Sequence, residues 1–312
     1  MDRSRLTTRL AGVVAIPVTP FGADGAVAEQ TFVDLLDRLV TAGVEAVTPN
    51  GNTSEFYSLT GAEARRCAEL AVRAVDGRAS VLVGVGHDVA TAVAAAEHAR
   101  EVGAELVMVH QPVHPFVSAG GWVDYHRAVA DAVPGLGVVP YVRDPAVTAA
   151  QLTALCDSCP NVVGIKYAVA DPVRFAAVAR DVGLDRLVWI AGLAEPYAPS
   201  AWVCGATGFT SGLVNVAPDT SLALLAALRA GDVPAAMAVW ERVRPFEELR
   251  AADRSADNVS VVKEALAQLG LCRPGVRPPL RQLGEAGRAA VREVLLGWGL
   301  TPVGPEGTED GR

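Results

Sequence analysis

The chain has 312 residues, of which 51% are hydrophobic and only 5% aromatic, and its 27 basic and 35 acidic residues give a formal net charge of -8. This acidic balance argues against a nucleic-acid backbone as the partner, because such binding relies on clustered basic residues. The length fits one α/β barrel with an appendage, and the apolar content, mostly Ala, Val and Leu, is typical of helices packed on a parallel sheet.

Short apolar runs alternate with helical patterns along the chain. Gly12 to Val18 predicts a first strand, and apolar residues from Phe32 to Val40 recur at helical spacing. Seven further strands are predicted at 46–48, 81–84, 106–110, 137–141, 161–167, 187–191 and 206–210. Helix starts are marked by capping residues, namely Thr60-x-x-Glu63, Asp88, Thr148-x-x-Gln151 and Asp171-Pro172.

Eight strands that alternate with helical segments at about 25 to 30 residues predict a (β/α)8 TIM barrel over residues 1–230. The last barrel helix is predicted at 218–230. Three further helices, near 233–249, 259–269 and 285–296, predict a C-terminal helical extension over residues 231–300, and residues 301–312 are predicted to be disordered. A doubly wound sheet is the alternative, but no Gly-x-Gly-x-x-Gly follows the first strand.

Cysteine usage and the amino terminus predict a cytoplasmic protein. The five cysteines are odd in number and lie mostly in apolar helical stretches, which suits reduced thiols. Cys156 and Cys159 have a redox or zinc half-site spacing, but no second pair accompanies them. Residues 1–10 carry four charges and no apolar core, and no apolar run is long enough to span a membrane.

One predicted strand ends on a lysine. The apolar run from Asn161 to Tyr167 follows Pro160 and suits a parallel strand buried on both faces. In a barrel the carboxyl ends of the strands carry the chemistry, and a desolvated lysine there can act as an amine nucleophile. The alternative is that Lys166 extends its head to solvent.

Polar residues follow several other predicted strands. They could converge with Lys166 on a small polyoxygenated acid, and they are Thr19, Asn52, Thr53, Tyr141, Arg143 and Ser211.

Three of these segments resemble the signatures of the dihydrodipicolinate synthase and N-acetylneuraminate lyase superfamily. Gly51-Asn52-Thr53-Ser54-Glu55 is similar to its Gly-x-Thr-Gly-Glu loop, and Tyr141 and Gly164-Ile165-Lys166 match the ends of its fifth and sixth strands. The segment 15–21 is similar to its first strand. The resemblance covers about residues 12–296. It implies a barrel with a helical extension in dimers or tetramers, a small oxo-acid substrate, and neither a metal nor an organic cofactor, while the lack of a long apolar run argues against a membrane partner.

The resemblance also implies a mechanism. Lys166 would form a Schiff base with a 2-oxo acid, Tyr141 would shuttle protons, and Gly51, Asn52 and Thr53 would bind the substrate carboxylate. The protonated imine would then serve as an electron sink for an aldol reaction or a dehydration. From the residues alone, Tyr141 can equally anchor the next loop and Thr53 can be an ordinary turn residue.

Several positions depart from the synthases of this superfamily. Asn52 replaces the first of two consecutive threonines, and Pro112-Val113-His114 replaces a Pro-Tyr-Tyr segment whose tyrosine reaches the neighbouring subunit. His114 becomes a candidate substrate contact in its place. These departures weigh against 4-hydroxy-tetrahydrodipicolinate synthase itself, which stays an alternative.

Other positions are similar to the 5-dehydro-4-deoxyglucarate dehydratases of the same superfamily. Arg143-Asp144 matches part of their Tyr-Asn-Arg-Asp-Asn segment, and residues 259–263 and 275–280 are similar to their carboxyl-terminal pattern. A dehydratase or aldolase is therefore predicted, with Arg143 on a distal carboxylate. The alternative for Arg143 is a surface salt bridge to Asp144.

Two readings come from other classes of protein. His87, His110 and His114 could ligate zinc in a metal-dependent hydrolase or aldolase, although no His-x-His follows the first strand. A catalytically idle barrel that binds a sugar acid is the other alternative.

Overall fold

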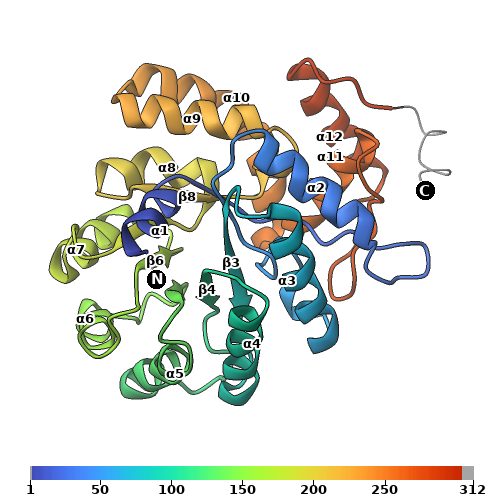
Figure 1. The fold of residues 1–312 in the computed structure, drawn as a ribbon. Coiled ribbons are helices and arrows are strands. Elements are labelled where there is room, and N and C mark those ends of the chain that lie inside the picture. Colours follow the sequence, from blue (N-terminus) through green and yellow to red (C-terminus); the bar gives the residue numbers. More distant parts are fainter. Residues whose placement is uncertain (1, 304–312) are drawn as a thin grey trace.

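The computed structural model describes residues 2–303, and the predicted disordered tail lies outside them from residue 304 onward. Eight parallel strands close into a barrel in chain order, surrounded by helices (Figure 1), so the predicted (β/α)8 architecture is confirmed. The strands are β1 (Val13–Ala15), β2 (Ala46–Val47), β3 (Ser80–Val85), β4 (Leu106–Val109), β5 (Gly137–Val142), β6 (Gly164–Tyr167), β7 (Val188–Ala191) and β8 (Gly208–Ser211).

The barrel helices and two short 3-10 turns connect these strands. They are α1 (Arg3–Leu10), α2 (Glu29–Thr41), η1 (Phe56–Ser58), α3 (Gly61–Val75), α4 (Val89–Glu101), α5 (Ala119–Ala132), α6 (Ala149–Ser158), α7 (Pro172–Val182), α8 (Ala194–Val203), η2 (Leu213–Asn215) and α9 (Pro218–Ala230). The extension is formed by α10 (Val233–Ser255), α11 (Asn258–Gln268) and α12 (Glu285–Gly297).

Local capping chemistry fixes where several helices begin. Thr60 and Thr148 form complete capping boxes at the starts of α3 and α6, as predicted. The carboxylates of Asp88 and Asp171 accept from the backbone N–H three residues ahead, at the starts of α4 and α7. Helix α5 begins at Ala119, where the Ser118 hydroxyl accepts from the Gly121 N–H and caps the helix.

The barrel interior is filled by small and branched side chains from alternate strand positions. They include Val14, Ala46, Leu82, Met108 and Ile190, and all are buried.

Helix α1 closes the amino-terminal end of this interior and was not predicted. Its Leu6 and Leu10 are 2% and 0% exposed and join the interior cluster. The Arg3 guanidinium holds the helix in place by donating to the Pro160 and Arg186 carbonyls. With this end closed, only the carboxyl-terminal mouth remains for a site.

The C-terminal extension packs on one side of the barrel, beside α2 and α9 (Figure 1). Its core joins Val243 and Phe246 of α10 to Val262 and Leu266 of α11, and it also takes in Leu213 of η2. Helix α10 runs past its predicted end at residue 249, although residues 252–254 lie outside helical φ and ψ. Within residues 2–303, no helix is both long and apolar enough to cross a membrane.

Candidate active site

Lys166 lies inside the barrel at the end of β6. Side chains alternate between the two faces of a strand, so Lys166 points inward while Ile165 and Tyr167 pack against the helices. Its register partner on β5 is Tyr141, and the Lys166 Nζ sits 4.0 Å from the centre of the Tyr141 ring. The side chain is 3% exposed, which contradicts the alternative of a lysine that extends to solvent.

The Lys166 amine is buried without an anion. Burial first, and the positive charge of Arg143 second, lower the pKa of the Lys166 amine to about 7. Among residues 2–303, no carboxylate forms an ion pair with it, although eleven other basic groups do form such pairs. At neutral pH a substantial fraction of the amine is therefore unprotonated and nucleophilic.

Tyr141 is a protonated hydroxyl beside this amine. Its side chain is 5% exposed, and burial raises the pKa of Tyr141 to about 12 although Arg143 opposes the rise. The Tyr141 hydroxyl oxygen accepts a hydrogen bond of 3.2 Å from the Asn52 side-chain amide. An amide nitrogen only donates, so the hydroxyl's own proton stays available to a substrate.

The loop after β2 is held in a fixed shape between two left-handed residues, Asn50 (φ 61°) and Glu55 (φ 59°). Ser54 N donates to the Gly51 carbonyl at 3.1 Å and Glu55 N donates to the Asn52 carbonyl at 3.0 Å. A Cβ on Gly51 would lie 2.5 Å from Ile16 Cγ2, so this position requires glycine. The sequence predicted the loop but not this conformation.

Two successive backbone N–H groups of the loop lack a hydrogen-bond acceptor among residues 2–303. Within the described part of the chain, the N–H groups of Asn52 and Thr53 donate no hydrogen bond. Successive free N–H groups in a tight turn form a concave site for a carboxylate. The structure therefore joins Gly51, Asn52 and Thr53 to Tyr141 through the Asn52 amide, and Tyr141 to Lys166.

The loop is also anchored to the segments that follow β1 and β4. Thr19, a predicted mouth residue, uses its hydroxyl to donate to the Ser54 carbonyl at 2.8 Å, so it holds the loop. The His110 Nε2 lies 2.8 Å from the Asn50 carbonyl. A Cβ on Gly84 would collide with that same carbonyl, which explains the glycine in β3.

Arg143 is exposed near the mouth. Its charge adds to the fall in the pKa of Lys166 that burial causes, and it partly opposes the rise in the pKa of Tyr141 that burial causes. The Asp144 carboxylate instead accepts from the Ala146 N–H at 2.8 Å, and in residues 2–303 no ion pair joins it to Arg143. The alternative of an Arg143–Asp144 salt bridge is therefore wrong.

Ser211 does not join this group. Its hydroxyl donates to the Glu195 carboxylate at 2.5 Å and accepts from the Val214 N–H at 2.9 Å, on the helix side of β8. The inward position of that strand is Thr210, one residue earlier. The prediction that Ser211 contacts substrate placed the hydroxyl on the wrong face of the strand.

Glu195 was missed by the sequence reasoning. It is 0% exposed, and burial, followed by the nearby Glu247 charge, raises the pKa of Glu195 to about 7. Two hydroxyls, of Ser211 and Ser221, donate to its Oε1. Glu195 is a buried acid on α8, between the strands and the helices, and no local sequence pattern predicted its role.

The alternative of a zinc site at the three histidines finds no support in their arrangement. His110 and His87 both stack on the Phe56 ring, with centroids 4.1 and 4.6 Å away. His114 stays on the surface, where its Nδ1 accepts from the Phe116 N–H at 3.1 Å. In the described part of the chain, no three His, Cys, Asp or Glu side chains gather as a metal site would require. The structure thus brings neither a zinc set nor His114 to Lys166.

Arg250 is a second residue that the sequence reasoning missed. It comes from α10 and is 4% exposed, and Glu247 forms an ion pair with it. A Cβ on Gly212 would collide with its guanidinium and lie 3.3 Å from the Thr53 hydroxyl. The extension therefore reaches the mouth beside the loop.

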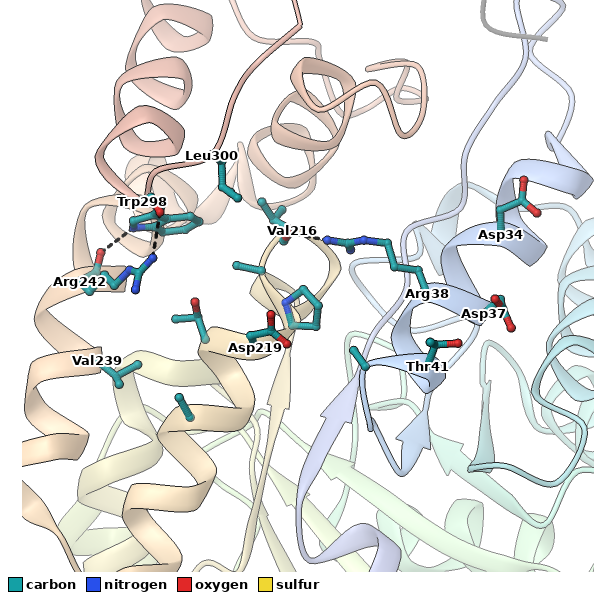
Figure 2. A pocket seen from close by; sticks show the side chains of 15 residues that line it. Asp34, Asp37, Arg38, Thr41, Val216, Asp219, Val239, Arg242, Trp298 and Leu300 are labelled. Carbon is teal, nitrogen blue, oxygen red and sulfur yellow. Dashed lines mark hydrogen bonds between the residues drawn. The ribbon is translucent and has the colours of Figure 1, made fainter.

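A groove of about 750 Å³ lies elsewhere, between α2, α9, α10 and the end of α12 (Figure 2). Arg38 points across it and donates to the Val216 carbonyl at 2.9 Å, and Arg242 donates to the Trp298 carbonyl at 3.1 Å. Both guanidinium groups thus tie chain segments together. None of the candidate catalytic residues lines this groove.

Comparison with known families gives a match over nearly the whole chain. The model of the dihydrodipicolinate synthetase family matches residues 9–296.

Curated relatives carry two different names. A 4-hydroxy-tetrahydrodipicolinate synthase of Phenylobacterium zucineum is 33% identical, over 93% of this chain and 97% of its own. A probable 5-dehydro-4-deoxyglucarate dehydratase of Methylobacterium radiotolerans is also 33% identical, over 91% of this chain and 94% of its own.

Solved structures show the same fold. A dihydrodipicolinate synthase of Oceanobacillus iheyensis superposes with a TM-score of 0.92 at 38% identity, covering 96% of this chain and 99% of that one.

Proposed function

The chain belongs to the dihydrodipicolinate synthetase family and is a lyase, and from this premise we propose that Lys166 forms a Schiff base with an oxo acid. One observation carries the proposal: a lysine buried at the mouth of the barrel has no anionic partner among residues 2–303, and its pKa is lowered to about 7. Such an amine meets the requirement for a nucleophile at neutral pH.

The proposed reaction begins at the Lys166 Nζ. The unprotonated amine attacks the carbonyl carbon, and the resulting carbinolamine loses water to give a protonated imine. The positive imine then accepts the electron pair released when a C–H or C–C bond breaks at the adjacent carbon. Elimination of hydroxide, which leaves as water after protonation, or an aldol step follows from the same enamine. With the diacid, elimination leaves an imine conjugated with a new C=C bond. This conjugated imine accepts the electron pair of the C–C bond to the distal carboxylate, which leaves as carbon dioxide.

The loop after β2 supplies the proposed site for the carboxylate next to the carbonyl. Its free Asn52 and Thr53 N–H groups and the Thr53 hydroxyl would donate to the two oxygens. Gly51 permits the close turn, since any side chain there would meet Ile16.

Tyr141 is the proposed proton donor and acceptor of the site. It stays protonated at neutral pH and receives a hydrogen bond from Asn52, so its own proton points to the reacting groups. Asn52 cannot pass a proton on as a hydroxyl can, so the exchange would occur directly between Tyr141 and the substrate or water.

Among the substrates, we favour a diacid such as 5-dehydro-4-deoxyglucarate. Arg143 is an exposed guanidinium at the rim and would bind the distal carboxylate, which pyruvate lacks. The synthase activity of the Phenylobacterium relative is the second candidate, because the two named relatives are equally similar. Assembly into dimers or tetramers stays a prediction.

Borohydride trapping tests the proposal. Lys166 and Lys263 are the only two lysines of the chain, so mass spectrometry of the reduced adduct can assign it without ambiguity. We expect pyruvate and 5-dehydro-4-deoxyglucarate to add to Lys166, and the diacid alone to release carbon dioxide and water. A folded sample that forms no adduct with any 2-oxo acid would overturn the Schiff-base proposal, and turnover with pyruvate and an aspartate semialdehyde would favour the synthase.

A further inference from the structure

The second lysine of the chain reaches the back of the carboxylate-binding loop from the extension. Lys263 lies on α11, and its Nζ donates to the Glu55 carboxylate, 208 residues away in sequence. We propose that Lys263 is a positioning residue, which acts through Glu55 to hold the free N–H groups of Asn52 and Thr53 toward the substrate. The inference rests on the proposed role of that loop in binding the substrate carboxylate.

The ion pair is entirely enclosed. The side chains of Lys263 and Glu55 are each 0% exposed. The Lys263 Nζ also donates to the Gly275 carbonyl at 2.7 Å, and the other Glu55 oxygen accepts from the Arg277 N–H at 2.9 Å. Both carboxylate oxygens are thus bound by groups of the extension, so the loop cannot turn away without breaking buried contacts.

Charged groups around the pair keep it in one arrangement. The Lys263 Nζ and the Arg277 guanidinium lie 4.1 and 4.2 Å from the centre of the Phe21 ring. The Arg277 guanidinium is itself paired with Glu63 of α3. Phe21, between β1 and α2, therefore makes cation–π contacts with two basic side chains, and both side chains belong to the extension.

The ion pair affects the substrate-binding loop through the backbone conformation of Glu55. This residue has φ 59° and ψ 36°, a left-handed conformation that non-glycine residues adopt only when their surroundings impose it. Its own N–H donates to the Asn52 carbonyl, which belongs to the same peptide group as the Thr53 N–H. Relaxation at Glu55 would therefore rotate the peptide that presents a proposed donor to the substrate.

The test combines hydrogen exchange with trapping. Lys263→Met removes the cation, and the double variant Glu55→Gln with Lys263→Met removes both charges, so that no unpaired buried carboxylate remains. We expect faster amide exchange in residues 50–58 of both variants. We also expect a half-saturating pyruvate concentration about 10 to 100 times higher in borohydride trapping, because a misplaced binding group can cost about 100-fold. The limiting trapping rate on Lys166 should change less than about threefold.

A purely structural role predicts a different pattern. The double variant would then recover wild-type half-saturation together with wild-type stability, and that result would overturn the inference, as would unchanged exchange in residues 50–58. Arg244→Met is the matched control. It removes an exposed cation of α10 whose two ion pairs are both made within α10 and not with the loop. If wild-type protein forms no adduct, the proposed function fails, while the exchange measurement still decides whether Lys263 holds the loop.

Discussion

The two lysines of the chain are both buried and have opposite surroundings. Lys263 is enclosed with the Glu55 carboxylate, which opposes the fall in its pKa that burial causes. Lys166 is enclosed with a tyrosine ring and faces the positive charge of Arg143, so nothing opposes the fall. The difference shows that burial alone does not decide the role of a lysine: a paired one ties segments together, and an unpaired one becomes a nucleophile.

The largest expected difference between the two lysines is in activity. We expect Lys166→Arg to lower turnover by at least about 1,000-fold, because a guanidinium cannot form the imine. Lys263→Arg keeps a cation at the ion pair and should retain most of the turnover. Steady-state kinetics on the substrate found by trapping measures both, and an active Lys166→Arg enzyme would refute the assignment.

The second difference is in stability. Lys263→Met leaves the Glu55 carboxylate buried and unpaired, so the free energy of unfolding should fall by about 3–5 kcal/mol. The double variant with Glu55→Gln should recover most of that loss. Urea denaturation followed by circular dichroism measures the change. A Lys263→Met protein as stable as wild type would show that the ion pair does not tie the extension to the loop.

The third difference is in the pH dependence of stability. The folded pKa of Lys166, about 7, lies below its unfolded value, so at this site the unfolded chain binds more protons between about pH 7 and 10.4. Stability from this group thus rises with pH across that window, and the full cost of burying the charge applies below it.

Replacing Lys166 by methionine removes that cost. We expect Lys166→Met to be more stable than wild type by a few kcal/mol at pH 6, with about 5 kcal/mol as a ceiling. The gain should shrink toward zero near pH 10. Denaturation midpoints at several pH values measure it, and a gain that does not depend on pH would mean that Lys166 has an ordinary pKa.

The smallest expected effect is that of a substitution at Asn52, near the end of the loop opposite Glu55. Asn52→Ala removes one hydrogen bond to Tyr141, so turnover should fall about three- to tenfold, in line with about 0.5–1.5 kcal/mol for such a bond. The limiting rate should fall more than the half-saturating concentration rises, in contrast with Lys263→Met. Equal changes in both variants would mean that the loop moves as one unit.

The sequence predicted what depends on neighbouring residues. The caps of α3, α4, α6 and α7 bond to residues three positions ahead, so their patterns are visible locally. Lys166 and Tyr141 end consecutive strands, and consecutive strands of a parallel barrel lie side by side, so their proximity was predictable too.

What the sequence could not predict depends on register and on distant partners. A shift of one residue turns a side chain to the other face of a strand, which is why Ser211 faces Glu195 and not the mouth. The ion pair between Glu55 and Lys263 joins residues 208 positions apart, and no local sequence pattern predicts it. Helix α1 was missed because only two of its side chains, Leu6 and Leu10, are buried.

The pKa of Lys166 decides whether this lysine can act as a nucleophile at neutral pH. Protein labelled with 13C at the ε carbon of lysine should give two resonances, one for each lysine, and Lys166→Met identifies them by removing one. We expect the Lys166 resonance to titrate with a midpoint at about pH 7. A midpoint above pH 9 for that resonance would contradict this expectation, because the amine would then be protonated and unreactive at neutral pH.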